Sequence, residues 1–412
     1  MAFSSKSDKY IKQNEKLSRE GYRVIAVCDG YVDSKKEEDI KNLEFLGMVA
    51  FIDPVRDEVK ESIRECQSAG IKVIMITGDH PGTAYAIARD LELVSSEKEV
   101  VTGMELEQAF KKGEKSFDKY IKDKRVFSRV TPTDKLNIVA SFKRCGEFVA
   151  VTGDGVNDAP AIKTANIGIA MGSGTDIAID TADMIIMDDN FSTIVNGVRE
   201  GRVAYANIRK IVLFLLSCGI AEVLFYLLSV CLGYELPLVA IQLLWLNIVT
   251  DGLQDMALSF EVGSRDIMKI PPRKTDESLF NKNLMMEVFV FGITIAIMIF
   301  IIWKYLMDNN TNILLSRSIV MLIMVFIQNI HVLNCRSEKN SIFTTPILSN
   351  SLVILTIVGS ILLQIIVIKV PILANFLKVT DLSVGIMLKA FAYSLIIIIV
   401  AEIYKVLNRK YR

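Results

Sequence analysis

The sequence predicts two architectures in succession: an α/β cytoplasmic domain with a Rossmann-like parallel sheet, and then an all-α six-helix transmembrane bundle. Before about residue 207, short apolar runs alternate with stretches of helical periodicity, which is typical of a parallel sheet with crossover helices. After that point the apolar runs are about 20 residues long, the length that crosses the hydrocarbon core of a bilayer. With 412 residues, 51% of them hydrophobic, the chain is too apolar to be entirely soluble.

Composition excludes several classes of protein. The formal net charge is zero and no basic tract is interleaved with aromatic residues, so we expect no nucleic-acid partner. The six cysteines form no close pairs, which argues against a zinc site and against a disulfide framework and favours reduced thiols. The first twenty residues are polar and rich in lysine, so no signal peptide is expected.

The first 39 residues are polar except for one apolar run at 22–28. A single strand is not stable without neighbours that bury its faces. We therefore expect residues 1–39 to be the remnant of a larger domain.

From residue 40 to 207 the pattern alternates between strand and helix. Such alternation predicts a parallel sheet that is covered by helices on both faces. The expected strands are 46–52, 71–76, 100–102, 126–128, 148–152, 167–170 and 184–187. The expected helices end at Ala69, Leu91, Lys112 and Cys145.

The most informative stretch is 149–160, Val-Ala-Val-Thr-Gly-Asp-Gly-Val-Asn-Asp-Ala-Pro. A buried strand that ends in a glycine turn would direct the carboxylates of Asp154 and Asp158 at one point. Mg²⁺ is usually held by one or two carboxylates together with substrate phosphate. An ordinary Asp-Gly turn is the alternative interpretation, but other polar residues at strand ends agree with the magnesium site.

Those other residues are Thr77, Gly78 and Asp79, which follow a predicted strand, and Lys135, which lies at the start of a predicted helix. Ligands of a parallel sheet lie beyond the carboxyl ends of its strands, so we expect these residues to converge with the two aspartates. The Thr77 hydroxyl and the amides around Gly78 suit phosphate oxygens, and Lys135 supplies a fixed positive charge. A solvated surface lysine is the alternative for Lys135, and Asp79 has a structural alternative of equal weight.

Three motifs carry a resemblance to a known fold. Thr-Gly-Asp at 77–79, Thr-Pro-Thr-Asp-Lys at 131–135 and the stretch at 152–160 resemble the second, third and fourth motifs of the haloacid-dehalogenase-like phosphoryl-transfer fold. The particular residues of these motifs are similar to those of the P-type cation-transporting ATPases, and most similar to those of the calcium-pump branch. Asp-Pro-Val-Arg at 53–56 resembles the hinge motif between the nucleotide-binding and phosphorylation domains of that family.

The resemblance implies a domain plan and a set of cofactors. Residues 1–39 would be a remnant of the nucleotide-binding domain, 40–207 the phosphorylation domain and 208–412 the cation-transport domain. ATP and Mg²⁺ are the implied cofactors. The implied catalytic residues are Thr77, Lys135, Asp154 and Asp158, the last two as Mg²⁺ ligands. The implied nucleotide- and phosphate-binding residues are Asp53, Arg56, Thr77, Gly78, Asp79, Lys135 and Asn157.

One departure from the family is decisive for activity. The family's phosphorylated aspartate lies in an Asp-Lys-Thr-Gly-Thr motif, which does not occur in this sequence. The resemblance therefore implies the C-terminal portion of a pump, with the N-terminal portion encoded in the same gene or in a split-gene partner. Without the nucleophile the other groups have nothing to activate, so we expect no autophosphorylation of this chain alone.

Six membrane spans are expected, at about 208–232, 238–257, 285–307, 315–335, 350–370 and 384–407. Arg209 and Lys210 precede the first span, the following turn at 233–237 has no Lys or Arg, and the next loop at 258–284 is rich in both. Positive residues concentrate on the cytoplasmic side, so both termini are expected to be cytoplasmic. A bacterial inner membrane is the expected location.

Polar residues inside these spans mark the expected transport site, because a charged group in the bilayer is costly. Glu222 lies in the first span, and Asn247, Asp251 and Asp255 follow at intervals of four in the second, with Thr250 alongside. In an α-helix this spacing places the residues on one face. An oxygen-only ligand set suits a hard cation and argues against Cu⁺ or Zn²⁺. The alternative is that these groups hold the helices together.

By resemblance, Glu222, Asn247, Thr250 and Asp251 match cation-ligand positions of calcium pumps, and Asp255 is an additional acid. Gly219 and Gln328 stand where those pumps have an asparagine and an acid. Ca²⁺ with one ion per cycle is therefore the first expectation, and Na⁺, Mn²⁺ and Mg²⁺ remain open. The alternative functions are a membrane-tethered phosphatase and a non-catalytic membrane protein that binds cations or regulates a pump.

Overall fold

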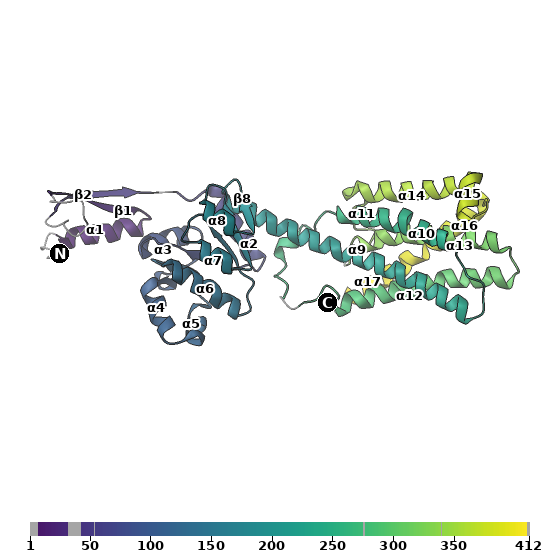
Figure 1. The fold of residues 1–412 in the computed structure, drawn as a ribbon, viewed down its shortest axis with the longest axis horizontal. Coiled ribbons are helices and arrows are strands. Elements are labelled where there is room, and N and C mark those ends of the chain that lie inside the picture. Colours follow the sequence, from purple (N-terminus) through teal and green to yellow (C-terminus); the bar gives the residue numbers. More distant parts are fainter. Residues whose placement is uncertain (1–6, 32–42, 53, 275–276, 339, 410–412) are drawn as a thin grey trace. The chain divides into compact units, whose positions relative to one another are not determined.

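The computed structural model describes residues 7–31, 43–52, 54–274, 277–338 and 340–409, and these residues form two compact units (Figure 1). The first unit runs to Arg199 and also contains the loop that starts at Arg265. The second unit comprises residues 200–264 and those from Glu277 onward. Each unit is described separately below.

The N-terminal part of the first unit is a helix and a two-stranded sheet. Helix α1 is Ser7–Arg19, and strands β1 (Arg23–Asp29) and β2 (Glu44–Phe51) pair antiparallel with Val24 opposite Ala50. The expectation that 22–28 lacks a partner and that 46–52 joins the parallel sheet was therefore wrong. Periodicity identifies a strand but not its partner, since pairing depends on residues distant in sequence.

The rest of the first unit alternates between strands and helices as expected. Its helices are α2 (Asp57–Ser68), α3 (Pro81–Asp90), α4 (Gly103–Lys111), α5 (Glu114–Ile121), α6 (Pro132–Arg144), α7 (Ala159–Thr164) and α8 (Asp176–Thr181). Its strands are β3 (Met75–Ile76), β4 (Val100–Thr102), β5 (Val126–Ser128), β6 (Ala150–Gly153), β7 (Ile167–Met171) and β8 (Met184–Ile186). All pairings are parallel, but they form two sheets, ordered β3-β5-β4 and β6-β7-β8, where a single sheet was expected.

The central strands of both sheets lie in the core. Val126 and Phe127 of β5 are fully buried, whereas the edge strands β3 and β6 are partly exposed. Helix α5, which the sequence analysis did not predict, covers the first sheet with Phe117 and Ile121, each at most 1% exposed. The helix has only eight residues, which is shorter than the window over which periodicity distinguishes a helix.

The loop that contains Pro271 and Pro272, called the Pro-Pro loop below, contacts the end of α2 within the first unit. Gly70 has φ +72°, and a Cβ atom there would lie 2.7 Å from Cδ of Pro272. Met268, in the same loop, is 6% exposed and packs against Cys66 and Val195. The loop is therefore seated on a surface that requires glycine at position 70.

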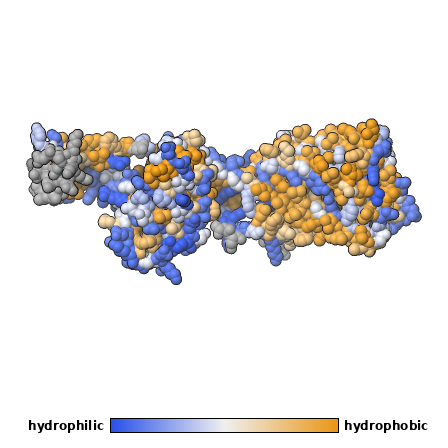
Figure 2. Space-filling view, viewed as in Figure 1, coloured by the Kyte–Doolittle hydropathy of each residue, from blue (hydrophilic) through white to orange (hydrophobic). Residues whose placement is uncertain are grey.

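The second unit is a helical bundle in which five helical stretches of the described residues are long and apolar enough to cross a membrane. They comprise α9 (Phe191–Cys231), α12 (Lys282–Asp308), α13 (Ile313–Cys335), α14 (Ser351–Lys369) and the pair α16 (Val384–Ser394) and α17 (Ile396–Arg409). The surface of these helices is mostly apolar in Figure 2. The expected second span is instead built from α10 (Ala240–Leu246), a π-helical segment, η3 (Asn247–Gly252), and α11 (Leu253–Ser259). Helix α15 (Pro371–Leu377) is a short connector.

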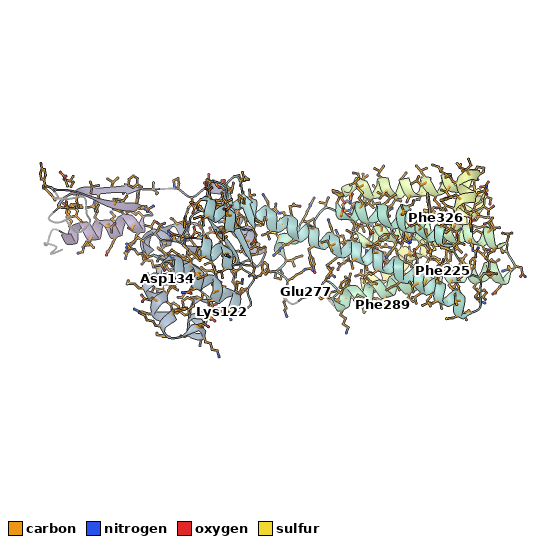
Figure 3. All side chains as sticks on the ribbon, viewed as in Figure 1. Lys122, Asp134, Phe225, Glu277, Phe289 and Phe326 are labelled. Carbon is orange, nitrogen blue, oxygen red and sulfur yellow. The ribbon has the colours of Figure 1, made fainter. Side chains whose placement is uncertain are left out.

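Helix α13 lies at the centre of the bundle. Residues 320–332 are all buried, and the helix contacts α12, α14, α16 and α17. The aromatic side chains of Phe225 on α9 and Phe326 on α13 are buried, whereas Phe289 on α12 is 48% exposed (Figure 3). A helix that is buried on all sides over this length is typical of a core position.

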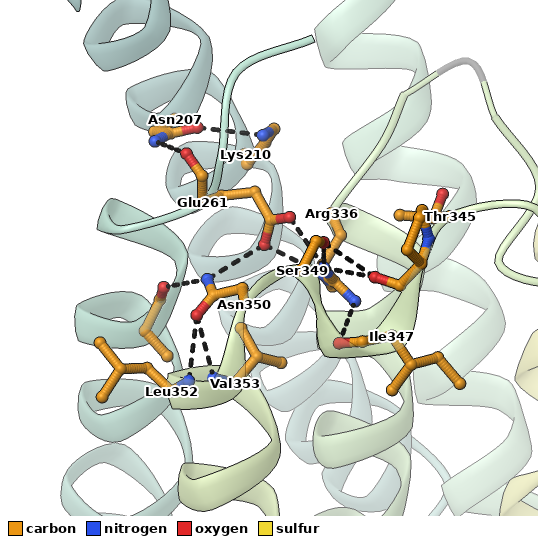
Figure 4. Close-up of polar contacts among 12 residues, drawn as sticks. Asn207, Lys210, Glu261, Arg336, Thr345, Ile347, Ser349, Asn350, Leu352 and Val353 are labelled. Carbon is orange, nitrogen blue, oxygen red and sulfur yellow. Dashed lines mark hydrogen bonds and ion pairs between the residues drawn. The ribbon is translucent and has the colours of Figure 1, made fainter. Parts of the chain in front are cut away.

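A buried ion pair fixes one end of α13. Arg336 donates two hydrogen bonds of 2.9 Å to the Glu261 carboxylate, and both residues are at most 5% exposed (Figure 4). Asn350 Nδ2 donates to Glu261 Oε2 at 3.1 Å, and Asn207 donates to the Glu261 carbonyl at 2.8 Å. The network joins α13 and the start of α14 through the Glu261 carboxylate, and α9 through the backbone carbonyl of the same residue.

Removal of the Arg336 guanidinium from this network should lower the stability of the bundle. We expect Arg336→Met to lower the free energy of unfolding of the bundle by about 3–5 kcal/mol, because Glu261 is left as a buried, uncompensated charge. SDS titration of the chain in detergent measures this loss. The control is Arg317→Met, since Arg317 is only half-buried on the same helix and, among the described residues, donates its hydrogen bonds to a backbone carbonyl, that of Leu236, and not to a carboxylate. Equal effects of the two substitutions would contradict the prediction.

The glycine at the Pro-Pro loop allows a second test. Gly146→Ala should cost about 1–2 kcal/mol through its positive φ of +83° alone, because no atom lies within 4 Å of the added methyl group. Gly70→Ala should cost about 1–3 kcal/mol more, because the methyl group also overlaps Pro272. Pulse proteolysis of the first unit in urea compares the two variants. Similar losses would show that the loop does not rest on Gly70.

Candidate functional site

The turn after β6 brings Lys135 and Asp158 together. Lys135 Nζ lies 2.5 Å from Asp158 Oδ1, and the Gly155 amide donates to Asp158 Oδ2 at 3.3 Å. A Cβ atom at Gly153 would overlap the Asp158 side chain, so only glycine allows this turn. The convergence of these two charged groups, predicted from the sequence, is present in the structure.

The start of α6 positions Lys135. Thr131 caps the helix: its hydroxyl accepts from the Asp134 amide at 3.2 Å, and Asp134 Oδ2 accepts from the Thr131 amide at 2.8 Å. Pro132 occupies the first helical position, where its missing N–H is not needed. A cation in the first turn is unfavourable against the helix dipole, so the nearby carboxylate of Asp158 compensates Lys135.

The loop after β3 is attached to the same region. The Val130 amide donates to the Thr77 carbonyl at 3.3 Å, and the Arg129 amide donates to the Asp79 carbonyl at 3.2 Å. The Thr77 hydroxyl donates to Asp79 Oδ2 at 3.0 Å, while Gly78 is exposed. Thr77, Asp79 and Lys135 are therefore connected through the segment that leads into α6.

Asp154 and Asp158 fit a magnesium ion. The Asp154 side chain is exposed and makes no hydrogen bond to any residue that the structure describes. Asn157, between the two acids, is also exposed. Among the described residues, no group of three or more His, Cys, Asp or Glu side chains is placed to hold a metal. Two carboxylates are nevertheless the usual protein contribution to a site where phosphate and water complete the Mg²⁺ shell.

Arg56, of the hinge motif at 53–56, lies beside the loop after β8 and, among the described residues, makes no hydrogen bond or ion pair with Lys135 or Asp158. Arg56 Nη1 donates to the Asp189 carbonyl at 3.2 Å, which places Arg56 beside the loop after β8. Hydrogen bonds from Ser173 hold the pKa of the Asp189 carboxyl below its usual value, and the charge of Arg56 adds to this shift. Asp53 lies outside the described residues. His80 follows the Thr-Gly-Asp motif and caps α3, and its partial burial lowers its pKa.

In the bundle, side chains from three helices meet at Gln328. Thr250 Oγ1 donates to Gln328 Oε1 at 2.6 Å, and Gln328 Nε2 donates to Glu222 Oε1 at 3.4 Å. Asp251 interacts electrostatically with Glu222 and Asp255. Oδ1 of Asp251 and Oδ1 of Asp255 are buried and have no hydrogen-bond partner among the described residues. Buried carboxylate oxygens without a partner require a cation or a proton.

The structure does not bring Asn247 into this group. Asn247 is exposed, and its Nδ2 donates to the Leu243 carbonyl at 2.9 Å. The expected alignment with Asp251 and Asp255 assumed α-helical spacing, but residues 247–252 are π-helical. Because i→i+5 hydrogen bonds widen the turn, residues four apart no longer share one face. π-helical turns in proteins are frequent at functional sites.

A second polar cluster was missed by the sequence analysis. Asn329 Oδ1 accepts from Gln254 Nε2 and from Ser360 Oγ, both at 2.7 Å, and Thr356 donates to Gln254 at 2.9 Å. The amide side chains of Gln254 and Asn329 within long apolar segments were the sequence signal that could have identified this cluster. These groups satisfy one another, so we assign them to helix packing.

Comparisons with known proteins agree with this arrangement of a phosphoryl-transfer fold and a membrane bundle. The family described as haloacid dehalogenase-like hydrolase matches residues 7–166, and the family described as cation transporting ATPase, C-terminus, matches residues 235–407. The chain therefore belongs to the P-type cation-transporting ATPase family, over both its α/β and its helical regions.

Its relatives include calcium-transporting ATPases. Calcium-transporting ATPase 1 of Bacillus cereus is 37% identical over 414 residues, covering 95% of this chain and 46% of the relative. The calcium-transporting ATPase of Bacillus subtilis is 40% identical over 86% of this chain and 40% of its own length. The human calcium-transporting ATPase type 2C member 1 is 35% identical over 98% and 43%, respectively. The chain thus spans less than half the length of these relatives.

Proposed function

We propose that the chain is the C-terminal part of an ATP-driven pump that exports Ca²⁺ across a membrane by Mg²⁺-dependent phosphoryl transfer. The observation that carries the proposal is the pair of buried, unpartnered carboxylate oxygens on Asp251 and Asp255. They lie in the same chain as the Lys135–Asp158 pair of a phosphoryl-transfer fold. The buried carboxylates in the bundle need a cation. The Lys135–Asp158 site suits the phosphoryl transfer that would drive movement of that cation across the membrane.

The α/β site would act mainly by electrostatics. Asp154 and Asp158 would hold Mg²⁺, which neutralises negative charge on the transferring phosphoryl group. The Thr77 hydroxyl and the backbone amide of Gly78 would bind phosphate oxygens. Lys135, held by Asp158, would place its positive charge where negative charge develops. Asp53, Arg56, Asp79 and Asn157 would contribute on the nucleotide side.

The open edges of β3 and β6 support a missing strand between the two sheets. Among the described residues β3 pairs only with β5, and β6 pairs only with β7. Ile76 of β3 and Val149, which precedes β6, pack against the same core cluster. A parallel strand between these edges would end beside Thr77 and Asp154 and could supply the acceptor aspartate. It would come from the N-terminal portion of the pump, in the same gene or a split-gene partner.

The cation site would be formed by Glu222, Thr250, Asp251 and Asp255. Asn247 would join it where the remaining membrane helices of the pump cover its exposed side. Gln328 supplies a neutral amide and already bridges Glu222 and Thr250, which favours one ion over two. The oxygen ligands and the calcium-transporting relatives favour Ca²⁺, while other hard cations remain to be compared.

The proposed location is a bacterial inner membrane, with several spans and both termini in the cytoplasm. The positive charges at Arg209, Lys210 and Arg265 support the orientation.

Phosphorylation tests the first half of the proposal. With ATP and Mg²⁺ the purified chain should form no acid-stable, hydroxylamine-labile phosphoenzyme, because it lacks the nucleophile. Addition of an N-terminal portion that contains Asp-Lys-Thr-Gly-Thr should restore it, and Lys135→Met should then lower the rate by about 10²-fold or more. A phosphoenzyme formed by the chain alone would refute this account. The DNA upstream of Met1 gives a separate test: a stop codon there, with no partner gene, would favour a non-catalytic membrane protein.

Cation binding tests the second half. In the complete pump we expect Asp251→Asn to weaken Ca²⁺ binding by at least about tenfold, or about 1.4 kcal/mol, because a buried carboxylate ligand is lost. Equilibrium dialysis with ⁴⁵Ca²⁺ measures the affinity. Asp308→Asn is the control, since Asp308 is an exposed acid of the same bundle that pairs with Lys304. Unchanged affinity in Asp251→Asn would remove the proposed site.

A further inference from the structure

The helix built from α10, the π-helical segment η3 and α11 is bonded to α14 on both sides of η3. Before the π turn, Nε1 of Trp245 on α10 donates to Oε1 of Gln364 at 2.8 Å. After the turn, Oε1 of Gln254 on α11 accepts from the Thr356 hydroxyl at 2.9 Å. Both partners belong to α14, where they lie eight positions apart, whereas the two bonded residues of the interrupted helix lie nine positions apart. The two helices therefore differ by one residue over the same interval.

This pairing is incompatible with a continuous α-helix between residues 245 and 254. Residues nine apart in an α-helix are separated by about 2.5 turns and point to opposite sides, whereas residues eight apart share one side. In a continuous α-helix, Trp245 and Gln254 could not both reach α14. The π turn at 247–252 takes up the extra residue, so both side chains meet the same helix.

The α10 side is held by two buried amides. Gln364 is 0% exposed, its Oε1 accepts only from Trp245 among the described residues, and its Nε2 has no partner among them. Without the indole this amide would be buried with neither of its groups bonded, which is costly. Gln242, also 0% exposed, donates from Nε2 to the carbonyls of Leu377 and Lys378 at the end of α15, at 3.1 and 3.0 Å. Because Gln242 and Trp245 are three positions apart, they fix the same face of α10.

The α11 side is held by contacts with two helices. Gln254, which is 0% exposed, also donates from Nε2 to Oδ1 of Asn329 on α13 at 2.7 Å. One turn further along, the Ala257 carbonyl accepts from Nδ2 of Asn350, the N-cap residue of α14, at 2.9 Å. These bonds hold α11 against α13 and α14 independently of α10.

The same contacts determine where the candidate cation ligands point. Asn247 is exposed and follows Trp245 by two positions, so it points to nearly the opposite side of the helix from α14. Thr250 and Asp251 are 0% and 4% exposed. They lie four and three positions before Gln254, on the side of the helix that α11 holds.

We propose that Gln242, Trp245 and Gln254 form a register lock with α14 and α15, which keeps the π turn in place and thereby positions the oxygen atoms of the cation site. The lock holds Asn247 on the exposed side of the helix and Asp251 on the buried side. The role of these two residues as cation ligands rests on the proposed function. The register lock itself acts through hydrogen bonds to neighbouring helices.

Loss of the lock on the α10 side has a defined structural outcome. π-helical turns are rare compared with α-helical ones, so without the α10 contacts the segment 247–252 should become α-helical. Since α11 stays bound, α10 would then turn by one residue, which is about 100°. Position 247 would take the direction now held by Leu246, which is 0% exposed.

Nitrogen NMR of the tryptophan indoles, with the chain in lipid nanodiscs, tests whether the lock exists. The chain has two tryptophans, so Trp303→Phe assigns both signals, and the Trp303 signal reports folding in the other variants. The Trp245 signal should be that of a hydrogen-bonded N–H, and Gln364→Leu should remove this hydrogen bond.

Two changes of chain length distinguish a register lock from a simple contact. Deletion of Ile248, which is 59% exposed, leaves Trp245 and Gln254 eight positions apart, so the bond to Gln364 should persist. Insertion of one alanine after Ile248 makes the interval ten positions, which one π turn does not take up, so the bond should be lost. A bond that is lost in the deletion variant, or kept in the insertion variant, would overturn the register lock.

Thiol labelling in detergent tests the position of residue 247. The background first loses its exposed cysteines through substitution by serine at Cys28, Cys145 and Cys231. One cysteine is then introduced, either as Asn247→Cys or as Met256→Cys. Met256, which is 61% exposed on α11, is the matched control because α11 does not turn.

With the lock intact, a maleimide should label both positions, since both are exposed. In Gln242→Leu combined with Gln364→Leu, labelling at 247 should become slower relative to labelling at 256, because position 247 turns to the buried side. An unchanged ratio of the two rates would overturn the proposal. Neither experiment uses ATP, Mg²⁺ or Ca²⁺, so a failure of the register lock is distinguished from a failure of the pump proposal.

Discussion

Charge in the apolar interior of the bundle must be compensated, and the arrangement of the second unit follows from this constraint. Glu261 meets it fully, with two hydrogen bonds from Arg336 and one from Asn350. Asp251 and Asp255 do not meet it within the described structure, since each has a buried oxygen with no partner. The bundle therefore distinguishes a structural carboxylate, whose hydrogen bonds are satisfied, from the two carboxylates that we propose as cation ligands.

The α/β unit shows the same principle at smaller scale. Lys135 lies in the first turn of α6, where the helix dipole disfavours a cation, and Asp158 compensates it from the turn after β6. Asp154 remains exposed beside this pair. The proposed magnesium site and the proposed missing strand both follow from this incomplete state: one carboxylate is available, and two strand edges beside it are unpaired among the described residues.

Local patterns were sufficient where neighbouring residues determine the structure. Thr131, Pro132 and Asp134 start α6 by capping, and the central strands β5 and β7 fall where apolar β-branched and aromatic residues predicted them. Pairing was less predictable. The run at 46–52 lies largely in strand β2, which pairs antiparallel with β1. This partner could not be predicted, because the sequence of an apolar strand fits a parallel and an antiparallel sheet equally well.

The sequence by itself determined which motifs and segments this protein carries: those similar to the phosphoryl-transfer motifs of the family, the long apolar segments and the acids within them. These features depend on residue type and short spacing. Tertiary structure alone decided that 247–252 is π-helical and turns Asn247 away, that Gln328 bridges Glu222 and Thr250, and that Trp245 and Gln254 both bond to α14. These outcomes depend on contacts between helices far apart in the chain, and no local pattern encodes which side chains will meet.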